Sequence, residues 1–240
     1  MIGILVGLVL SWVLLYLFEK RSLLALGALP PVKRSIQFLT GFLVTGILCS
    51  GVEYLELLAG NGQWKINNAA SSGLILNMFW WDFKSVLTEE LLFRGALFFI
   101  LIRRIGAFKA ILLSAVTFGI YHWFSFGILG DIVPMIIVFI GTGLMGYAMA
   151  LAFHRTASMA MPIGFHLGWN FTFNSIFSNG PLGKGLLLTD GAQAISDWYS
   201  LIGLLLVPLI VLLIVIYWVP KVLDNSIFSV WDVSMLKIQQ

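Results

Sequence analysis

Seven apolar runs constrain this chain more than any other feature, because each can cross or nearly cross the about 30 Å hydrocarbon core of a bilayer. The runs cover Ile2–Phe18, Ile36–Leu58, Phe83–Ile102, Ala110–Trp123, Ile132–Phe153, Met159–Phe177 and Leu201–Val219. Of the 240 residues 60% are hydrophobic, whereas a soluble domain is about 45 to 50% apolar. The runs predict an all-α fold, a polytopic transmembrane helical bundle of about seven spans, with residues 1–240 as one integral membrane domain.

Three further segments are predicted to lie at the membrane surface or beyond it. Gly73–Trp81 precedes the third run and is expected to form an interfacial lead-in, since tryptophan favours that level. The proline pair in the first loop prevents a continuous helix there, so Ser22–Leu29 is expected to be an amphipathic surface segment. The tail from Pro220 is expected to be a short cytoplasmic extension.

Loop charges predict the orientation of the bundle. Ten basic residues lie in the first, third and fifth loops and the tail: Lys20, Arg21, Lys33, Arg34, Arg103, Arg104, Lys109, Arg155, Lys221 and Lys237. The alternate loops carry two, Lys65 and Lys184. Because lysine and arginine are retained on the cytoplasmic side, we expect a cell-membrane protein with its N-terminus outside and its C-terminus in the cytoplasm.

Composition also argues against several classes of function. The net charge of +3 comes from basic residues at the ends of apolar runs, and they form no stripe that would bind nucleic acid. Cys49 is the single cysteine, so this chain can build neither an intrachain disulfide nor a thiolate zinc or iron–sulfur site. Composition therefore predicts the lipid bilayer as a partner and predicts no nucleic acid.

Glu89, Glu90 and Arg94 lie within six residues inside the third run. An ionisable side chain at bilayer depth costs about 2.5 to 3.5 kcal/mol even on insertion scales, so it normally faces a protein interior or a water-filled cavity. Glu90 and Arg94 are four residues apart on one helix face and can form a charge-assisted pair. Glu89 is rotated about 100° from that face and is free for chemistry.

Four polar residues on three runs are predicted to reach one membrane depth. Glu89, His122, His166 and Asn170 lie 14, 13, 11 and 15 residues from the cytoplasmic basic markers Arg103, Lys109 and, for the last two, Arg155. These separations correspond to about 17 to 23 Å along a helix. Helix propensity does not require this coincidence, so it predicts a polar intramembrane cavity in the outer half of the bilayer.

Each of these residues also has a structural explanation. A buried pair such as Glu90 and Arg94 can simply fix helix packing. An intramembrane histidine or asparagine can be a hydrogen-bonded bundle residue, which applies to His122 and Asn170 taken singly. Asn174, one turn after Asn170, either extends the polar face or serves packing alone. The combination on three runs is what favours chemistry.

Three motifs carry a resemblance to a known family. They are Glu89-Glu90-Leu-Leu-Phe-Arg94, Phe118-Gly-Ile-Tyr-His122 and His166-Leu-Gly-Trp-Asn170. Their order on successive runs resembles the CAAX prenyl protease and bacteriocin-processing family of intramembrane endopeptidases, over a catalytic core at residues 83–177. The resemblance implies a peptide or protein substrate at the membrane. It also implies that Glu89 with His122 activates water, that His166 with Asn170 holds the oxyanion, and that Glu90 and Arg94 fix helix orientation.

A zinc site is the alternative chemistry, because one glutamate and two histidines can bind this metal as catalytic sites do. The chain lacks His-Glu-x-x-His, and Asn170 beside His166 suits an oxyanion better than a metal. We therefore expect no metal and no other cofactor.

Two other functions compete with peptide hydrolysis. The same polar cluster could bind a partner without cleaving it, as in a bacteriocin-immunity or regulatory scaffold. A small transporter is the weaker alternative, since its polar residues should form a path across the membrane and here they gather at one level. The sequence leaves open the substrate, its prenylation and the oligomeric state.

Overall fold

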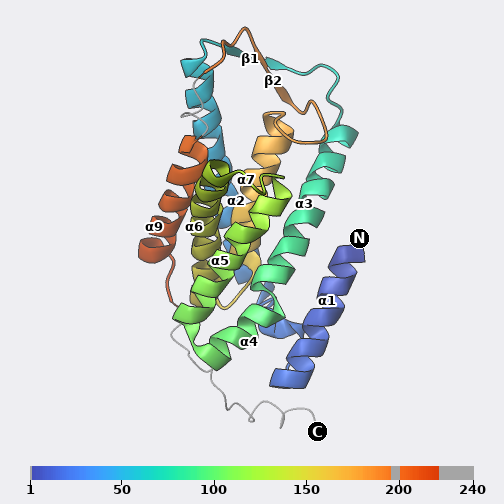
Figure 1. Cartoon of the computed structure of the whole chain (residues 1–240). Helices are drawn as coiled ribbons and strands as arrows, with labels where there is room; N and C mark the ends of the chain where they lie inside the picture. Colours follow the sequence, from blue (N-terminus) through green and yellow to red (C-terminus); the bar gives the residue numbers. More distant parts are fainter. Residues whose placement is uncertain (1, 196–200, 222–240) are drawn as a thin grey trace.

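A computed structural model describes residues 2–195 and 201–221 as a helical bundle (Figure 1). Its α-helices are α1 (Ile2–Leu14), α2 (Pro31–Ala59), α3 (Ser72–Arg94), α4 (Ala96–Ile105), α5 (Ala107–Ser125), α6 (Ile132–Thr156), α7 (Ala160–Phe171) and α9 (Val207–Trp218). Short helical segments of π or 3-10 type are η1 (Leu15–Glu19), η2 (Leu23–Leu26), η3 (Thr172–Ile176) and η4 (Ile202–Leu206). The helical architecture expected from the apolar runs is confirmed.

Four helical segments among the described residues are long and apolar enough to cross a membrane. They are Ile2–Glu19, Pro31–Ala59, Ala107–Ser125 and Ile132–Thr156. Ile202–Trp218 is apolar but shorter. The protein is therefore an integral membrane protein, while the count of seven spans stays a prediction.

The third predicted span differs from the observed helices. The Ser71 hydroxyl accepts a hydrogen bond from the Leu74 backbone N–H and caps α3, so residues 73–81 are helical and continuous with the third predicted span. Their position at the membrane interface stays a prediction. The helix ends at Arg94, and the chain turns at Gly95, where an added Cβ would overlap the Leu91 carbonyl oxygen. The run expected over Phe83–Ile102 is therefore divided between α3 and α4 (Figure 1).

Two short strands form a sheet that the apolar pattern did not predict. β1 (Gln63–Ile66) pairs antiparallel with β2 (Leu187–Asp190), and Lys65 forms an ion pair with Asp190. The sheet lies at the upper end of the bundle in Figure 1, opposite α4. Four-residue strands in polar loops are too short to produce a recognisable alternation of apolar residues.

The segment expected on the membrane surface over Ser22–Leu29 contains only the single 3-10 turn η2. The predicted tail from Pro220 lies almost wholly outside the described residues, which end at Lys221.

Close contact between α2 and α7 fixes the position of the third motif. The Thr45 hydroxyl donates a 2.7 Å hydrogen bond to the Phe165 carbonyl oxygen. An added Cβ on Gly164 or Gly168 would overlap the carbonyl oxygens of Phe38 or Phe42 on α2. Small residues thus allow the two backbones to touch, as is common between membrane helices.

Candidate active site

Glu90 and Arg94 form the ion pair that their spacing predicted. Arg94 Nη1 lies 3.2 Å from Glu90 Oε1, and neither side chain is exposed. Arg94 Nη2 also donates a 3.4 Å hydrogen bond to the Gly146 carbonyl oxygen on α6. The guanidinium therefore ties α3 to α6 in addition to neutralising Glu90.

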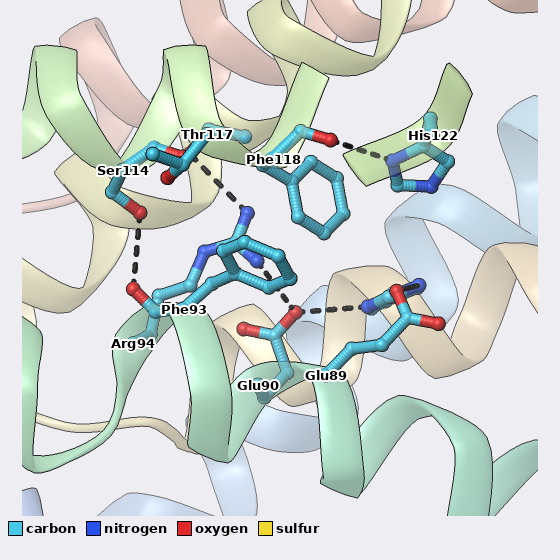
Figure 2. Close-up of polar contacts among 10 residues, drawn as sticks. Glu89, Glu90, Phe93, Arg94, Ser114, Thr117, Phe118 and His122 are labelled. Atoms are coloured by element: carbon cyan, nitrogen blue, oxygen red, sulfur yellow. Dashed lines mark hydrogen bonds and ion pairs between the residues drawn. The ribbon is translucent and has the colours of Figure 1, made fainter. Parts of the chain in front are cut away.

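His166 contacts both glutamates, which the sequence did not predict. Its Nδ1 lies 2.8 Å from Glu90 Oε1, and its Nε2 lies 3.8 Å from Glu89 Oε2. Glu90 Oε1 thus accepts hydrogen bonds from Arg94 and His166 together (Figure 2). The assignment of Glu90 to Arg94 alone was incomplete, because that assignment used helix spacing within α3 and could not include a partner on α7.

His122 lies on α5, facing the glutamates of α3 across the site in Figure 2. Its Nδ1 is 2.8 Å from the Phe118 carbonyl oxygen. A carbonyl oxygen can only accept, so Nδ1 carries the hydrogen and Nε2 of the neutral ring presents a lone pair. This backbone contact fixes the tautomer and the orientation of the imidazole.

Phe118 connects the three motifs by its ring. The Arg94 guanidinium lies 4.1 Å from the ring centroid, within the range of a cation–π contact. The rings of His122 and His166 lie 4.5 Å and 6.0 Å from it in edge-on arrangements. Phe118 is 2% exposed and packs against Gly146, so its ring is held in place between these groups.

Asn170 follows His166 by one turn of α7 and is half-buried. Within the described part of the chain its side chain forms no hydrogen bond, and no direct bond joins Glu89 to His122. Glu89 Oε2 is buried and has no hydrogen-bond partner among the described residues. These groups therefore retain donors and acceptors for a ligand.

A second polar cluster, which the sequence analysis did not predict, lies beside the motif residues. Asp82 is 1% exposed, and its carboxylate accepts a 2.6 Å hydrogen bond from Asn174 Nδ2 and a 3.2 Å hydrogen bond from Ser175 Oγ. Asp82 precedes Glu89 by seven residues and so shares its helix face, a spacing that could have identified it. The cluster joins α3 to η3, the π-helical continuation of α7.

The large groove that the structure shows lies elsewhere, between α2, α7 and α9, and none of Glu89, His122, His166 and Asn170 lines it. The polar cavity expected around these four residues stays a prediction. Among the described residues no group of three or more His, Cys, Asp and Glu side chains has an arrangement suited to a metal ion.

Comparison with known families found one that the central part of the chain resembles. Residues 71–172 match the family described as Type II CAAX prenyl endopeptidase Rce1-like. This segment of the chain is therefore similar to the Rce1-like family. The match runs from the N-cap of α3 to the end of α7 and contains all three motifs.

The resemblance derived from the motifs is thereby confirmed, and the Rce1-like family implies a protease that acts on a peptide at the membrane. Searches of curated proteins and of solved structures found no match.

Proposed function

We propose that this Rce1-like protein is an intramembrane endopeptidase that uses Glu89 to hydrolyse a peptide bond at the membrane. The observation that carries the proposal is the contact of His166 with both glutamates, 3.8 Å from Glu89 and 2.8 Å from Glu90. This contact places the Glu89 carboxylate, which has an oxygen without a hydrogen-bond partner among the described residues, beside the His166 imidazole, whose orientation is fixed by Glu90. Such a pair is a typical starting point for acid–base chemistry.

Glu89 is the proposed general base, with His122 orienting the nucleophilic water. The water would donate one hydrogen bond to Glu89 and the other to the His122 Nε2 lone pair. Its oxygen attacks the carbonyl carbon of the substrate while its proton passes to Glu89. When the carbon–nitrogen bond breaks, Glu89 returns this proton to the leaving amine, so that one water is consumed for each bond cleaved.

His166 and Asn170 are the proposed donors to the oxyanion. Glu90 can only accept as a carboxylate, so His166 Nδ1 carries a hydrogen, and Nε2 becomes a second donor when the ring is protonated. The Asn170 amide supplies a neutral donor one turn away.

Glu90 and Arg94 are proposed as positioning residues. Their pair holds His166 from the side away from Glu89, and Arg94 attaches the assembly to α6. A donor aimed at an oxyanion contributes about 10²- to 10³-fold to turnover, which is lost when the donor moves.

The test begins with identification of the substrate peptide. Membrane peptidomes from cells with the wild type and with Glu89→Gln would be compared, with Glu56→Gln as a carboxylate control on α2. We expect fragments that disappear with Glu89→Gln and persist with Glu56→Gln. Identical peptidomes in all three strains would contradict the assignment and favour a scaffold that binds without cleaving.

A chelator experiment on the purified protein tests the metal-free mechanism. Activity should survive chelation. Loss of activity that stoichiometric zinc restores would assign the same residues to a metal site instead.

A further inference from the structure

The groove between α2, α7 and α9 is a second feature with the form of a binding site. Its volume is about 1120 Å³, larger than the roughly 300 to 1,000 Å³ of most small-molecule pockets. Most of its lining is apolar, with Ile36 and Val44 of α2 facing Ile214 and Trp218 of α9. It contains none of the motif residues and so has no part in the proposed hydrolysis.

The groove is as long as one leaflet of a bilayer. Its wall on α2 extends from Val32 to Val44, a rise of twelve residues or about 18 Å along the helix. Half of the hydrocarbon core of a bilayer is about 15 Å thick. An occupant that fills the groove along α2 therefore has the length of a lipid chain in one leaflet.

Charge is confined to one end of the groove. Lys33 lies in the first turn of α2 and Lys221 follows α9, so both ammonium groups belong to the end at which α2 begins. Neither lysine forms an ion pair within the described part of the chain. The nearby Arg34 has partners within the protein, since it donates hydrogen bonds to the carbonyl oxygens of Leu29 and Thr156.

We propose that this groove binds an anionic phospholipid, with its acyl chains along α2 and its phosphate between Lys33 and Lys221. A long apolar groove complements an amphiphile with a negatively charged head when two lysines at one end form no ion pair among the described residues. Basic pockets between transmembrane helices bind anionic lipid headgroups in the same way.

Lipid binding can be measured by native mass spectrometry of the purified protein, titrated with phosphatidylglycerol or with phosphatidylcholine of the same chains. Each lysine near a membrane surface contributes about 1 kcal/mol to anionic lipid binding, so Lys33→Gln/Lys221→Gln should weaken phosphatidylglycerol binding by roughly 10- to 100-fold. Phosphatidylcholine binding should change little.

Two matched controls separate this site from general surface charge. Lys20→Gln/Lys109→Gln removes two exposed lysines near the same end of the bundle and should preserve phosphatidylglycerol binding. Thr40→Trp fills the groove and should reduce binding of both lipids, whereas Leu39→Trp on the adjacent exposed face should not. The melting temperature without added lipid shows that each variant is folded.

Equal losses in the two lysine pairs would overturn the proposal, because they would show a diffuse charge effect. Equal affinity of the wild type for the two lipids, or binding that Thr40→Trp leaves unchanged, would also overturn it. A wild type that binds no phosphatidylglycerol would overturn it as well.

Discussion

Glu90 connects two of the motifs in the candidate site by hydrogen bonds. Its fully buried carboxylate accepts from Arg94 at 3.2 Å and from His166 at 2.8 Å, and so couples α3 to α7. Glu89, the next residue, keeps a buried oxygen with no hydrogen-bond partner among the described residues. Adjacent glutamates therefore differ in environment, and their substitutions should differ in effect.

Glu90→Leu should destabilise the protein strongly, because it leaves Arg94 charged and buried without its partner. Loss of one member of a buried pair costs about 3 to 5 kcal/mol, and the melting temperature in detergent should fall accordingly. The double variant Glu90→Leu/Arg94→Met should recover most of this stability. It should not recover peptide cleavage, since His166 would still lack its Nδ1 acceptor. Full stability of Glu90→Leu alone would contradict a structural role for the pair.

A second prediction for single residues concerns the buried carboxylate of Asp82. Hydrogen bonds to charged groups contribute about 1.5 to 3 kcal/mol, so Asp82→Ala and Asn174→Ala should each destabilise the protein. Because both remove the same contact, the double variant should be little worse than either single variant when melting temperatures are compared. Asp131→Ala, at an exposed position, serves as the control. Additive losses would show that the two residues act independently.

At the scale of elements, the packing of α7 on α2 decides where the third motif lies. Gly168→Ala would force a methyl group against the Phe42 carbonyl oxygen on α2 and should cost about 1 to 3 kcal/mol. Gly51→Ala is the matched control on α2, because no atom lies within 4 Å of its added Cβ. We expect a lower melting temperature and slower cleavage for the first variant only. Equal effects of the two changes would contradict close packing at Gly168.

The apolar runs predicted some helices correctly and others with wrong bounds, and each outcome has a physical reason. The apolar runs at Ala110–Trp123 and Ile132–Phe153 fall within α5 and α6, since both are apolar enough to be read by hydrophobicity alone. The third predicted run omits the N-terminal half of α3, because the run begins directly after the charged residue Asp82. Its carboxylate is instead buried by partners on η3, and that contact depends on tertiary packing.

The residues of the candidate site could be predicted from the sequence, whereas the contacts between them could be predicted only in part. Spacing within α3 identified the pair of Glu90 with Arg94, because both residues lie on one helix. The contact of Glu90 with His166 depends on how α7 is rotated against α3, which no periodicity within either helix determines. For the same reason Phe118 was recognised as a motif residue, but its stacking on Arg94 was not foreseen.

At the scale of the whole molecule, the basic residues in the loops predict an orientation in the membrane. The sheet of β1 and β2 is predicted to lie on the outer side and α4 on the cytoplasmic side. Cysteines at the exposed positions Lys184 and Lys109 test this orientation, since they lie on opposite sides of the predicted bundle. A membrane-impermeant maleimide applied to intact cells should label Lys184→Cys and should reach Lys109→Cys only after lysis. The buried native Cys49 serves as the background. The reverse pattern would place the candidate site in the cytoplasmic half of the bilayer.

The central claim is that Glu89 performs the chemistry while its neighbour supports the fold. The most direct test is the rate of cleavage of an identified peptide by purified wild type, Glu89→Gln and Glu56→Gln, with the melting temperature of each. We predict that Glu89→Gln retains the wild-type melting temperature and loses cleavage, while Glu56→Gln retains both. Cleavage by Glu89→Gln at the wild-type rate would contradict the account.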